Sequence, residues 1–200
     1  MNKKNIIRGI LSIYKYPIFA IACNREVFPK LRRDITRRFR ENDRPITKFE
    51  AFCRILQEKN VATVFLSRLK DRTVIYHLFS FFYKTNTNIE ILTPSNKIGP
   101  GLIVYHNLGA VLRAKEIGDD VTVSQGVTIG AGGDWHNTNQ DNIPTIGSRV
   151  LIATNAIVIG NITIGDDSII GAGAVITKDV PPGVVVVGNP QRIIKRSAGI

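Results

Sequence analysis

The stretch from residue 146 to residue 176 reads IGSRVLIATNAIVIGNITIGDDSIIGAGAVI, and Ile or Val recurs in it at every sixth position. Six positions further upstream keep this spacing apart from one extra residue: Ile98, Val104, Val111, Ile117, Val123 and Ile129. Helices repeat near 3.6 residues and strands at 2, so a sustained period of six indicates neither as a continuous element. It is typical of a solenoid built from six-residue units.

Each unit is expected to supply one short strand and one turn, with the β-branched residue pointing into a narrow core. A glycine often follows that residue, as in Ile164-Gly165 and Ile170-Gly171, and permits a tight corner. Three units make one coil, so the twelve units predict about four coils stacked in parallel, roughly 4.8 Å apart. The fold class predicted from the period is therefore mainly β.

Three segments at the end of the ladder resemble the C-terminal sequence of the hexapeptide-repeat acyltransferases. They are Gly171-Ala172-Gly173-Ala174-Val175, Asp179-Val180-Pro181-Pro182-Gly183 and Val187-Gly188-Asn189-Pro190-Gln191-Arg192. Within that group the chain is similar to the serine acetyltransferases and to the related sugar and capsular polysaccharide O-acetyltransferases, over about residues 89 to 196. The resemblance implies a left-handed parallel β-helix, although parallel crossovers are otherwise nearly always right-handed. It also implies a small α-helical N-terminal domain.

We predict two units in the chain. Residues 1–88 form a basic helical domain of three or four helices, and residues 89–200 form the β-helix domain, with a C-terminal tail from about residue 181. The hexad spacing breaks between Val104 and Val111, and again between Ile129 and Ile146, where residues 131–145 form an inserted polar loop. Because insertions in a solenoid project from one face, often the binding face, we expect function where the irregular coil and the loop meet.

Positive charge is confined to the N-terminal part. Residues 1–88 hold 19 Lys and Arg against 7 Asp and Glu, a net charge of +12, whereas the remaining residues have a net charge of −1. Much of it clusters in Lys30-Leu31-Arg32-Arg33 and Arg37-Arg38-Phe39-Arg40. The simplest interpretation is a solvated helix face, and the second is a surface for an anionic membrane or an acidic glycan. No nucleic-acid motif accompanies the cluster, so nucleic acid is not an expected partner.

Two apolar segments in the first 88 residues lead to predictions about membrane spanning and burial. Ile10 to Cys23 is interrupted by Lys15 and Pro17 and is shorter than the roughly 20 apolar residues of a membrane span. Val74 to Tyr83 is apolar on nearly all sides, so it should be buried against the first coil or another subunit. The cysteines lack metal or redox spacing and no cleavable signal is found, which favours a cytoplasmic location, with a peripheral contact at the inner face of the membrane as a further hypothesis.

Two of the three histidines coincide with the interruptions of the ladder. His106 stands in a segment resembling the one that holds the catalytic histidine of serine acetyltransferases. Imidazole, with an unperturbed pKa near 6.5, suits removal of a hydroxyl proton at neutral pH. The resemblance implies that an Asp carboxylate contacts the other ring nitrogen of this histidine. Glu90 lies one residue from the position of that Asp, and it is Glu instead of Asp. His77, in the apolar helix, is expected to be packed and structural.

The inserted loop carries the residues expected to bind the acceptor. Asp134, Trp135 and His136 match a family segment that reads Asp-Arg-His. In the family its Arg helps to hold the carboxylate of serine, and Trp135 replaces that Arg here. Tyr105 replaces the Asp that helps to hold the ammonium group. Flat rings with polar edges are a usual way to hold a sugar. We therefore predict a sugar or polysaccharide hydroxyl as the acceptor, with serine as the alternative.

The resemblance implies acetyl-CoA as co-substrate, lying along the groove between neighbouring subunits of a homotrimer. The matching positions are Gly130, Ala153, Gly171, Ala172, Lys178 and Arg192. Small residues let the pantetheine arm approach the backbone, and the two cations suit its phosphates. The prediction is an acetyl-CoA-dependent O-acetyltransferase without a metal.

Two other classes compete with this function. The zinc-dependent hydratases that share the solenoid, the γ-class carbonic anhydrases, need three closely placed histidine ligands, whereas His106 and His136 stand far apart in the chain. A non-catalytic trimeric scaffold, in which the basic helices bind a partner, would leave both histidine-bearing interruptions unexplained. Failure to bind acetyl-CoA would favour that scaffold.

Overall fold

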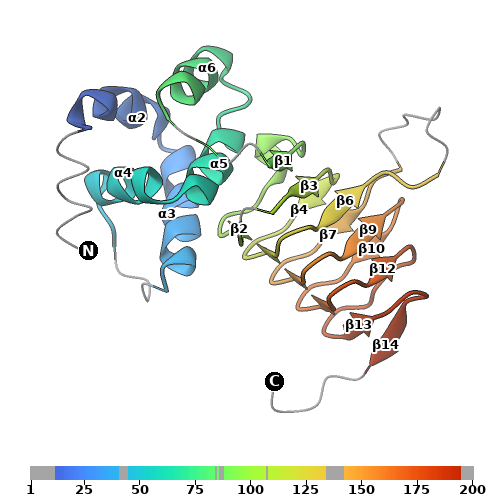
Figure 1. Ribbon diagram of the computed structural model, residues 1–200. Coiled ribbons are helices and arrows are strands. Elements are labelled where there is room, and N and C mark those ends of the chain that lie inside the picture. The colour runs from blue at the N-terminus through green and yellow to red at the C-terminus, as the bar shows by residue number, and fades with distance from the viewer. Residues whose placement is uncertain are drawn as a thin grey trace.

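The structure is a computed structural model that describes residues 12–40, 45–83, 85, 88–106, 108–133 and 142–194. A group of helices stands at one end of a stack of short strands (Figure 1). A short 3-10 turn, η1 (Ile13–Lys15), is followed by five α-helices: α2 (Tyr16–Ala22), α3 (Val27–Arg38), α4 (Lys48–Gln57), α5 (Lys59–Ser67) and α6 (Thr73–Phe82). The prediction of three or four helices was too low. One reason is that the extended backbone of Glu58 (φ −133°) separates α4 from α5.

Aromatic side chains fill the core of the helical region. Four phenylalanines are fully buried and linked by ring contacts: Phe19, Phe52, Phe65 and Phe79. Helix α4 begins with a capping box, in which Thr47 Oγ1 accepts a hydrogen bond from the Glu50 N–H at 3.2 Å. In return the Glu50 carboxylate accepts one from the Thr47 N–H at 2.9 Å.

The strands form three sheets that make the three sides of the coils. The first contains β1 (Ile89–Ile91), β3 (Ala110–Leu112), β6 (Thr128–Gly130), β9 (Ile157–Ile159) and β12 (Val175–Ile176). The second contains β2 (Ile103–Val104), β5 (Thr122–Val123), β8 (Leu151–Ile152), β11 (Ile169–Ile170), β13 (Val185–Val187) and β14 (Arg192–Ile194). The third contains β4 (Glu116–Ile117), β7 (Thr145–Ile146) and β10 (Thr163–Ile164). The 3-10 turn η2 (Ser95–Lys97) lies between β1 and β2. Neighbouring strands pair in parallel except β13 and β14, which are antiparallel.

The ladder of inward-pointing residues is as predicted at eleven of the twelve positions, all of which are buried. Val111 is the exception: it is 36% exposed, and Leu112 takes the inward place opposite Ile129. Adjacent residues of a strand point to opposite faces, so a shift of one residue exchanges core for surface. The first interruption therefore holds one residue more than the sequence pattern indicated, between Val104 and Leu112.

Helix α6 is not buried as predicted. Phe79 and Tyr83 are buried, but Val74, Leu78 and Phe81 are 72%, 45% and 82% exposed. The helix packs on α2 and α5 at the outside of the helical group, so the described residues cover only one of its faces. His77, predicted to be packed, is likewise exposed. Burial of the outer face by another subunit remains a prediction.

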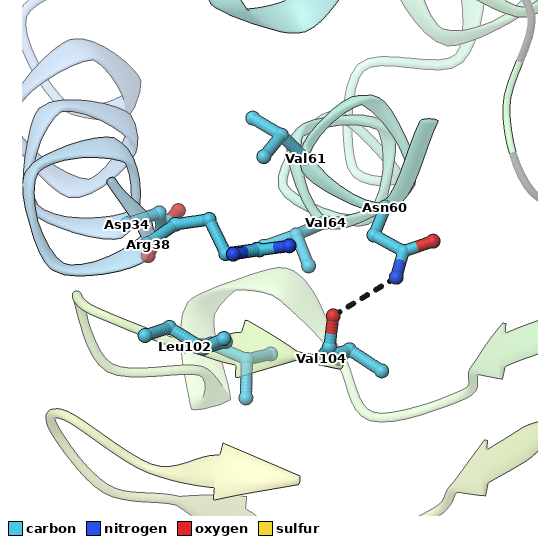
Figure 2. Close-up of a pocket in the computed structure, with 8 residues that line it drawn as sticks. Asp34, Arg38, Asn60, Val61, Val64, Leu102 and Val104 are labelled. Atoms are coloured by element: carbon cyan, nitrogen blue, oxygen red, sulfur yellow. Dashed lines mark hydrogen bonds between the residues drawn. The ribbon is translucent and has the colours of Figure 1, made fainter. Parts of the chain in front are cut away.

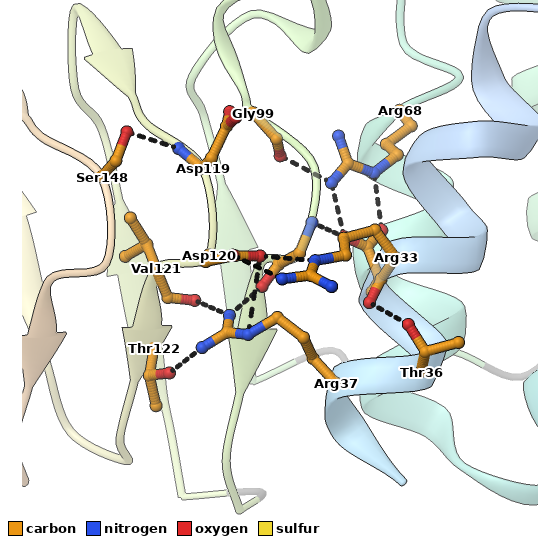
Figure 3. A network of polar contacts seen from close by, with 12 residues as sticks. Arg33, Thr36, Arg37, Arg68, Gly99, Asp119, Asp120, Val121, Thr122 and Ser148 are labelled. Atoms are coloured by element: carbon orange, nitrogen blue, oxygen red, sulfur yellow. Dashed lines mark hydrogen bonds and ion pairs between the residues drawn. The ribbon is translucent and has the colours of Figure 1, made fainter. Parts of the chain in front are cut away.

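The basic cluster of α3 does not form a solvated face, because several of its members contact the first coils of the solenoid (Figure 3). Arg33 binds both oxygens of the Asp120 carboxylate, at 2.9 and 2.8 Å. Arg37 donates to the carbonyl of Gly101 and, at 3.1 Å, to the hydroxyl of Thr122. Arg32 and Arg40 remain exposed. The surface predicted for an anionic partner is correspondingly smaller.

A buried ion pair completes this contact. Arg68, just after α5, forms two 2.7 Å hydrogen bonds with Asp34 of α3, and both side chains are almost completely buried. Arg68 also donates to the carbonyls of Ile98 and Gly99, at 3.2 and 2.9 Å. Asp34 accepts a hydrogen bond from the N–H of Gly101 at 2.7 Å. The pair therefore joins two helices to the first coil.

No helix in the described ranges combines the length and the apolar character that a membrane crossing requires.

Candidate active site

His106 lies at the corner that follows β2, where the first interruption begins. The N–H of Tyr105 still belongs to the ladder and donates to the carbonyl of Val123 at 2.8 Å. His106 then has a φ of +63°, in the left-handed region that non-glycine residues seldom adopt. Its side chain is exposed. The corner therefore turns the imidazole away from the core, where a substrate can reach it.

Tyr105 is half-buried beside His106, and the two rings lie 6.1 Å apart. The guanidinium of Arg38, from α3, lies over the Tyr105 ring at 4.8 Å from its centre. Arg38 also forms an ion pair with Glu58 at 2.6 Å. Sequence reasoning did not assign Arg38 to the site, because no short-range pattern links residue 38 to residue 105.

Asn60 is a second residue that sequence reasoning missed. It lies on α5, and its side-chain amide donates to the carbonyls of Val104 and His106, both at 3.0 Å. Figure 2 shows the amide of Asn60 directed from the helix toward the carbonyl of Val104. The helical region thus contacts the candidate site through Arg38 and Asn60.

Glu90, the predicted partner of His106, lies on a different sheet of the coils from β2, the strand that His106 follows. It is an exposed residue of β1, opposite Val111 in the register, and no hydrogen bond joins it to His106 among the described residues. Its neighbour is Lys70: burial lowers the pKa of the Lys70 ammonium, and the charge of Glu90 partly offsets this shift. The role of Glu90 in orienting the histidine remains a prediction.

The predicted acceptor residues Asp134, Trp135 and His136 fall outside the described residues. The stem of the inserted loop is described: the N–H of Gly132 donates to the carbonyl of Asn142 at 3.2 Å. The Asn142 side-chain oxygen accepts from the N–H of Asn161 at 3.0 Å, in the next coil. The loop therefore leaves the solenoid after β6, whereas His106 follows β2. These are two different corners of the coils.

The residues predicted to bind acetyl-CoA divide between the same two corners. Ala153 and Gly171 directly follow β8 and β11, so they stack below the corner of His106, with Ala172 beside them. Gly130 is the last residue of β6, and Lys178 comes soon after β12. Both strands belong to the sheet from which the inserted loop leaves the solenoid. Arg192 is exposed on β14.

Nothing among the described residues requires a glycine at position 130. A Cβ atom built on it would meet nothing within 4 Å, and its φ is outside the left-handed region. Gly171 differs, because its Cβ would lie 2.9 Å from Val187 Cγ1. The bare backbone at Gly130 leaves room for an outside group to approach closely. The described residues contain no cluster of three His, Cys, Asp or Glu side chains placed to hold a metal.

Comparison with known proteins relates this geometry to one group of transferases. The family model described as bacterial transferase hexapeptide (six repeats) matches residues 143–178. Serine acetyltransferase of Helicobacter pylori (strain ATCC 700392 / 26695) is 43% identical over 111 residues, 55% of this chain and 63% of the relative. Serine acetyltransferase of Mycobacterium tuberculosis is 43% identical over 117 residues, 58% of this chain and 49% of the relative. The chain thus spans about half to two thirds of the curated relatives.

Solved structures extend the similarity into the helical region. The crystal structure of Neisseria gonorrhoeae serine acetyltransferase superimposes with a TM-score of 0.65 and 27% identity, covering 89% of this chain and 71% of that one. Soybean serine acetyltransferase in complex with serine gives a TM-score of 0.55 at 27% identity, with 88% and 72% covered. These findings confirm the resemblance to hexapeptide-repeat acyltransferases. They also confirm the fold class, a left-handed parallel β-helix preceded by a small helical region.

Proposed function

We propose that this chain is an acetyl-CoA-dependent serine O-acetyltransferase. The observation that carries the proposal is His106, an exposed imidazole held in a left-handed backbone conformation at the irregular coil. It is supported by the similarity of the chain to serine acetyltransferases. Serine was the alternative acceptor in the sequence prediction, and the comparisons favour it over a sugar.

The chemistry assigned to His106 is general base catalysis. Its imidazole takes the proton from the acceptor hydroxyl as the oxygen attacks the thioester carbonyl of acetyl-CoA. Backbone N–H groups stabilise the oxyanion of the tetrahedral intermediate. The C–S bond then breaks, the acetyl group stays on the acceptor oxygen, and the departing sulfur takes the proton from the imidazolium. The products are the O-acetyl ester and free CoA thiol.

The described residues fit acetyl-CoA at the solenoid surface. Gly130 leaves its backbone open where a pantetheine arm would lie, and Lys178 and Arg192 are exposed for phosphate contacts. Ala153 and Ala172 add small side chains at the neighbouring corner. All six predicted residues are part of this proposal.

We further infer a homotrimer. Within one chain, His106 and the stem of the inserted loop lie at different corners of the coils. A second copy packed against the first would bring its loop, with Asp134, Trp135 and His136, to the His106 of its neighbour. Sedimentation of a monomer at micromolar concentration would leave the site without that loop and contradict this arrangement.

A sugar hydroxyl is retained as a second candidate acceptor, because of one observation. The position where the resemblance places a carboxylate for the ammonium group of serine holds Tyr105, covered by the guanidinium of Arg38. A guanidinium repels an ammonium group, and an aromatic ring suits a sugar. The pairing of Arg38 with Glu58 weakens this repulsion.

The proposal is tested by measuring CoA thiol release from acetyl-CoA with serine and with a panel of sugars. Serine should be the better acceptor. His106→Asn should lower kcat by about 10²- to 10⁴-fold while acetyl-CoA binding is retained. His77→Asn, an exposed histidine of α6, is the matched control and should keep normal turnover. Near-normal turnover of His106→Asn would exclude it as the base, and preference for a sugar would promote the second candidate.

A further inference from the structure

Hydrogen bonds between successive coils are regular in the sheet that contains β2. In the later coils, the carbonyl at the position that matches Val104 accepts a hydrogen bond from an N–H of the preceding coil. The donor–acceptor pairs are Tyr105 to Val123, Ser124 to Ile152, Ala153 to Ile170 and Gly171 to Val186, all at 2.8 to 2.9 Å. Val104 occupies the same rung in the first coil, where no earlier coil exists to supply a donor.

Asn60 supplies that missing donor. Its side-chain amide reaches the Val104 carbonyl at 3.0 Å, in the manner of the N–H of a preceding coil (Figure 2). The same amide nitrogen donates at 3.0 Å to the carbonyl of His106, the residue with φ of +63°. One side chain thus bridges the last residue of β2 and the left-handed residue of the corner.

The burial of Asn60 argues that these hydrogen bonds are needed. The residue is only 4% exposed, at the start of a helix whose neighbouring residues Val61 and Val64 are apolar and buried. A buried amide is unfavourable unless its hydrogen bonds are made, and Asn is also a poor helix former. An apolar side chain would pack there with less cost if filling space were the only requirement.

We propose that Asn60 is a positioning residue for His106. By holding the carbonyls on either side of Tyr105, it keeps the corner in the left-handed conformation that directs the imidazole outward. Without it, His106 relaxes toward a commoner backbone conformation, and its ring moves away from the acceptor hydroxyl. This inference rests on the proposed function, since it assigns Asn60 a purpose through the general base.

The decisive variants are Asn60→Leu, which keeps the size of the side chain without its donors, and the milder Asn60→Ala. Each should lower kcat by about 10- to 100-fold, because displacement of a catalytic group by about 1 Å costs up to 10²-fold, while the KM for acetyl-CoA stays unchanged. Asn60→Gln retains the amide and should recover part of the loss. Lys30→Met is the matched control: it also removes a side-chain donor to a first-coil carbonyl, that of Ile98 at 3.0 Å, but away from His106.

A second measurement separates this inference from the proposed function. The ring signal of His106 in a ¹H–¹³C NMR spectrum, assigned by its loss in His106→Asn, should shift or split in Asn60→Ala and stay in place in Lys30→Met. If the wild-type protein has no acetyltransferase activity, the proposed function fails but the ring signal still tests the positioning. An unchanged ring signal together with normal kcat in Asn60→Ala would overturn the inference. Equal losses of kcat in Asn60→Ala and Lys30→Met would reduce Asn60 to a general contact between helices and coils.

Discussion

The backbone carbonyls of the first coil and those of the later coils of the solenoid accept hydrogen bonds from different kinds of donor. In the later coils the carbonyls of each strand receive N–H groups from the coil before, and the inward positions are almost completely buried and are Ile or Val apart from Leu112. The first coil has no predecessor, so its carbonyls receive side-chain donors from the helical region: Lys30, Arg37, Asn60, Arg68 and Lys70. Four of these five are cations, which accounts for part of the charge asymmetry of the chain. In the regular part of a solenoid the repeat itself supplies the hydrogen-bond donors, whereas the exposed backbone at its end needs donors from another part of the protein.

Removing Arg68 is expected to have the largest effect on this end. Arg68→Met leaves Asp34 charged and buried without its partner, which should lower the free energy of unfolding by about 3–5 kcal/mol. The measurement is urea unfolding at pH 7. Arg149→Gln, which removes an exposed ion pair with Asp167 in the regular coils, is the control and should change stability little. A similar loss in both variants would contradict the distinction between the two parts.

The next largest loss of stability is expected at Leu112, the residue that points inward in place of Val111. Leu112→Ala removes a fully buried side chain and should cost about 2–4 kcal/mol of unfolding free energy. Val111→Ala, one residue away on the outer face, should stay within about 0.5 kcal/mol of the wild type. The pair is compared in the same unfolding experiment. A greater loss at Val111 would restore the register predicted from the sequence.

The ion pair between Arg33 and Asp120 should contribute less, because the Arg33 side chain is 40% exposed. Arg33→Gln is expected to cost about 0.5–1 kcal/mol, and the cost should shrink as salt screens the pair. Arg32→Gln, next to it on α3 but exposed, is the control and should have no measurable effect. If the two variants behave alike, the basic cluster is a solvated face after all.

The same ion pair predicts the smallest effect, a dependence of stability on pH. The hydrogen bond from Arg33 lowers the pKa of the Asp120 carboxyl below its ordinary value near 3.9. A carboxyl whose pKa is lower in the folded state stabilises the fold above the unfolded pKa and loses this contribution as the pH falls through the folded value. Stability should therefore decline below about pH 4, and less steeply in Asp120→Asn. Identical profiles for the two proteins between pH 2 and 5 would refute this.

The candidate site was only partly predictable from the sequence. His106 was found because it coincides with a break in a strong repeat and lies in a segment resembling a known catalytic one. Glu90 was selected by its place in the chain, yet the structure puts it beside Lys70. Arg38 and Asn60 carried no signal, because a lone Arg or Asn within a helix has no pattern that marks a partner on a distant strand.

The sequence by itself determined the β-helix and its core, since each six-residue unit places its own β-branched residue inward and its own small residue at a corner. It likewise determined the capping box of α4, which involves residues three apart. Only the tertiary structure decided that Leu112 and not Val111 points inward, because both are apolar and the number of residues at an irregular corner depends on the neighbouring strands. Only the tertiary structure, too, placed Asn60 on His106 and Arg33 on Asp120. These contacts join residues 46 and 87 positions apart, and such pairs arise from packing the helical region onto the open end of the coils.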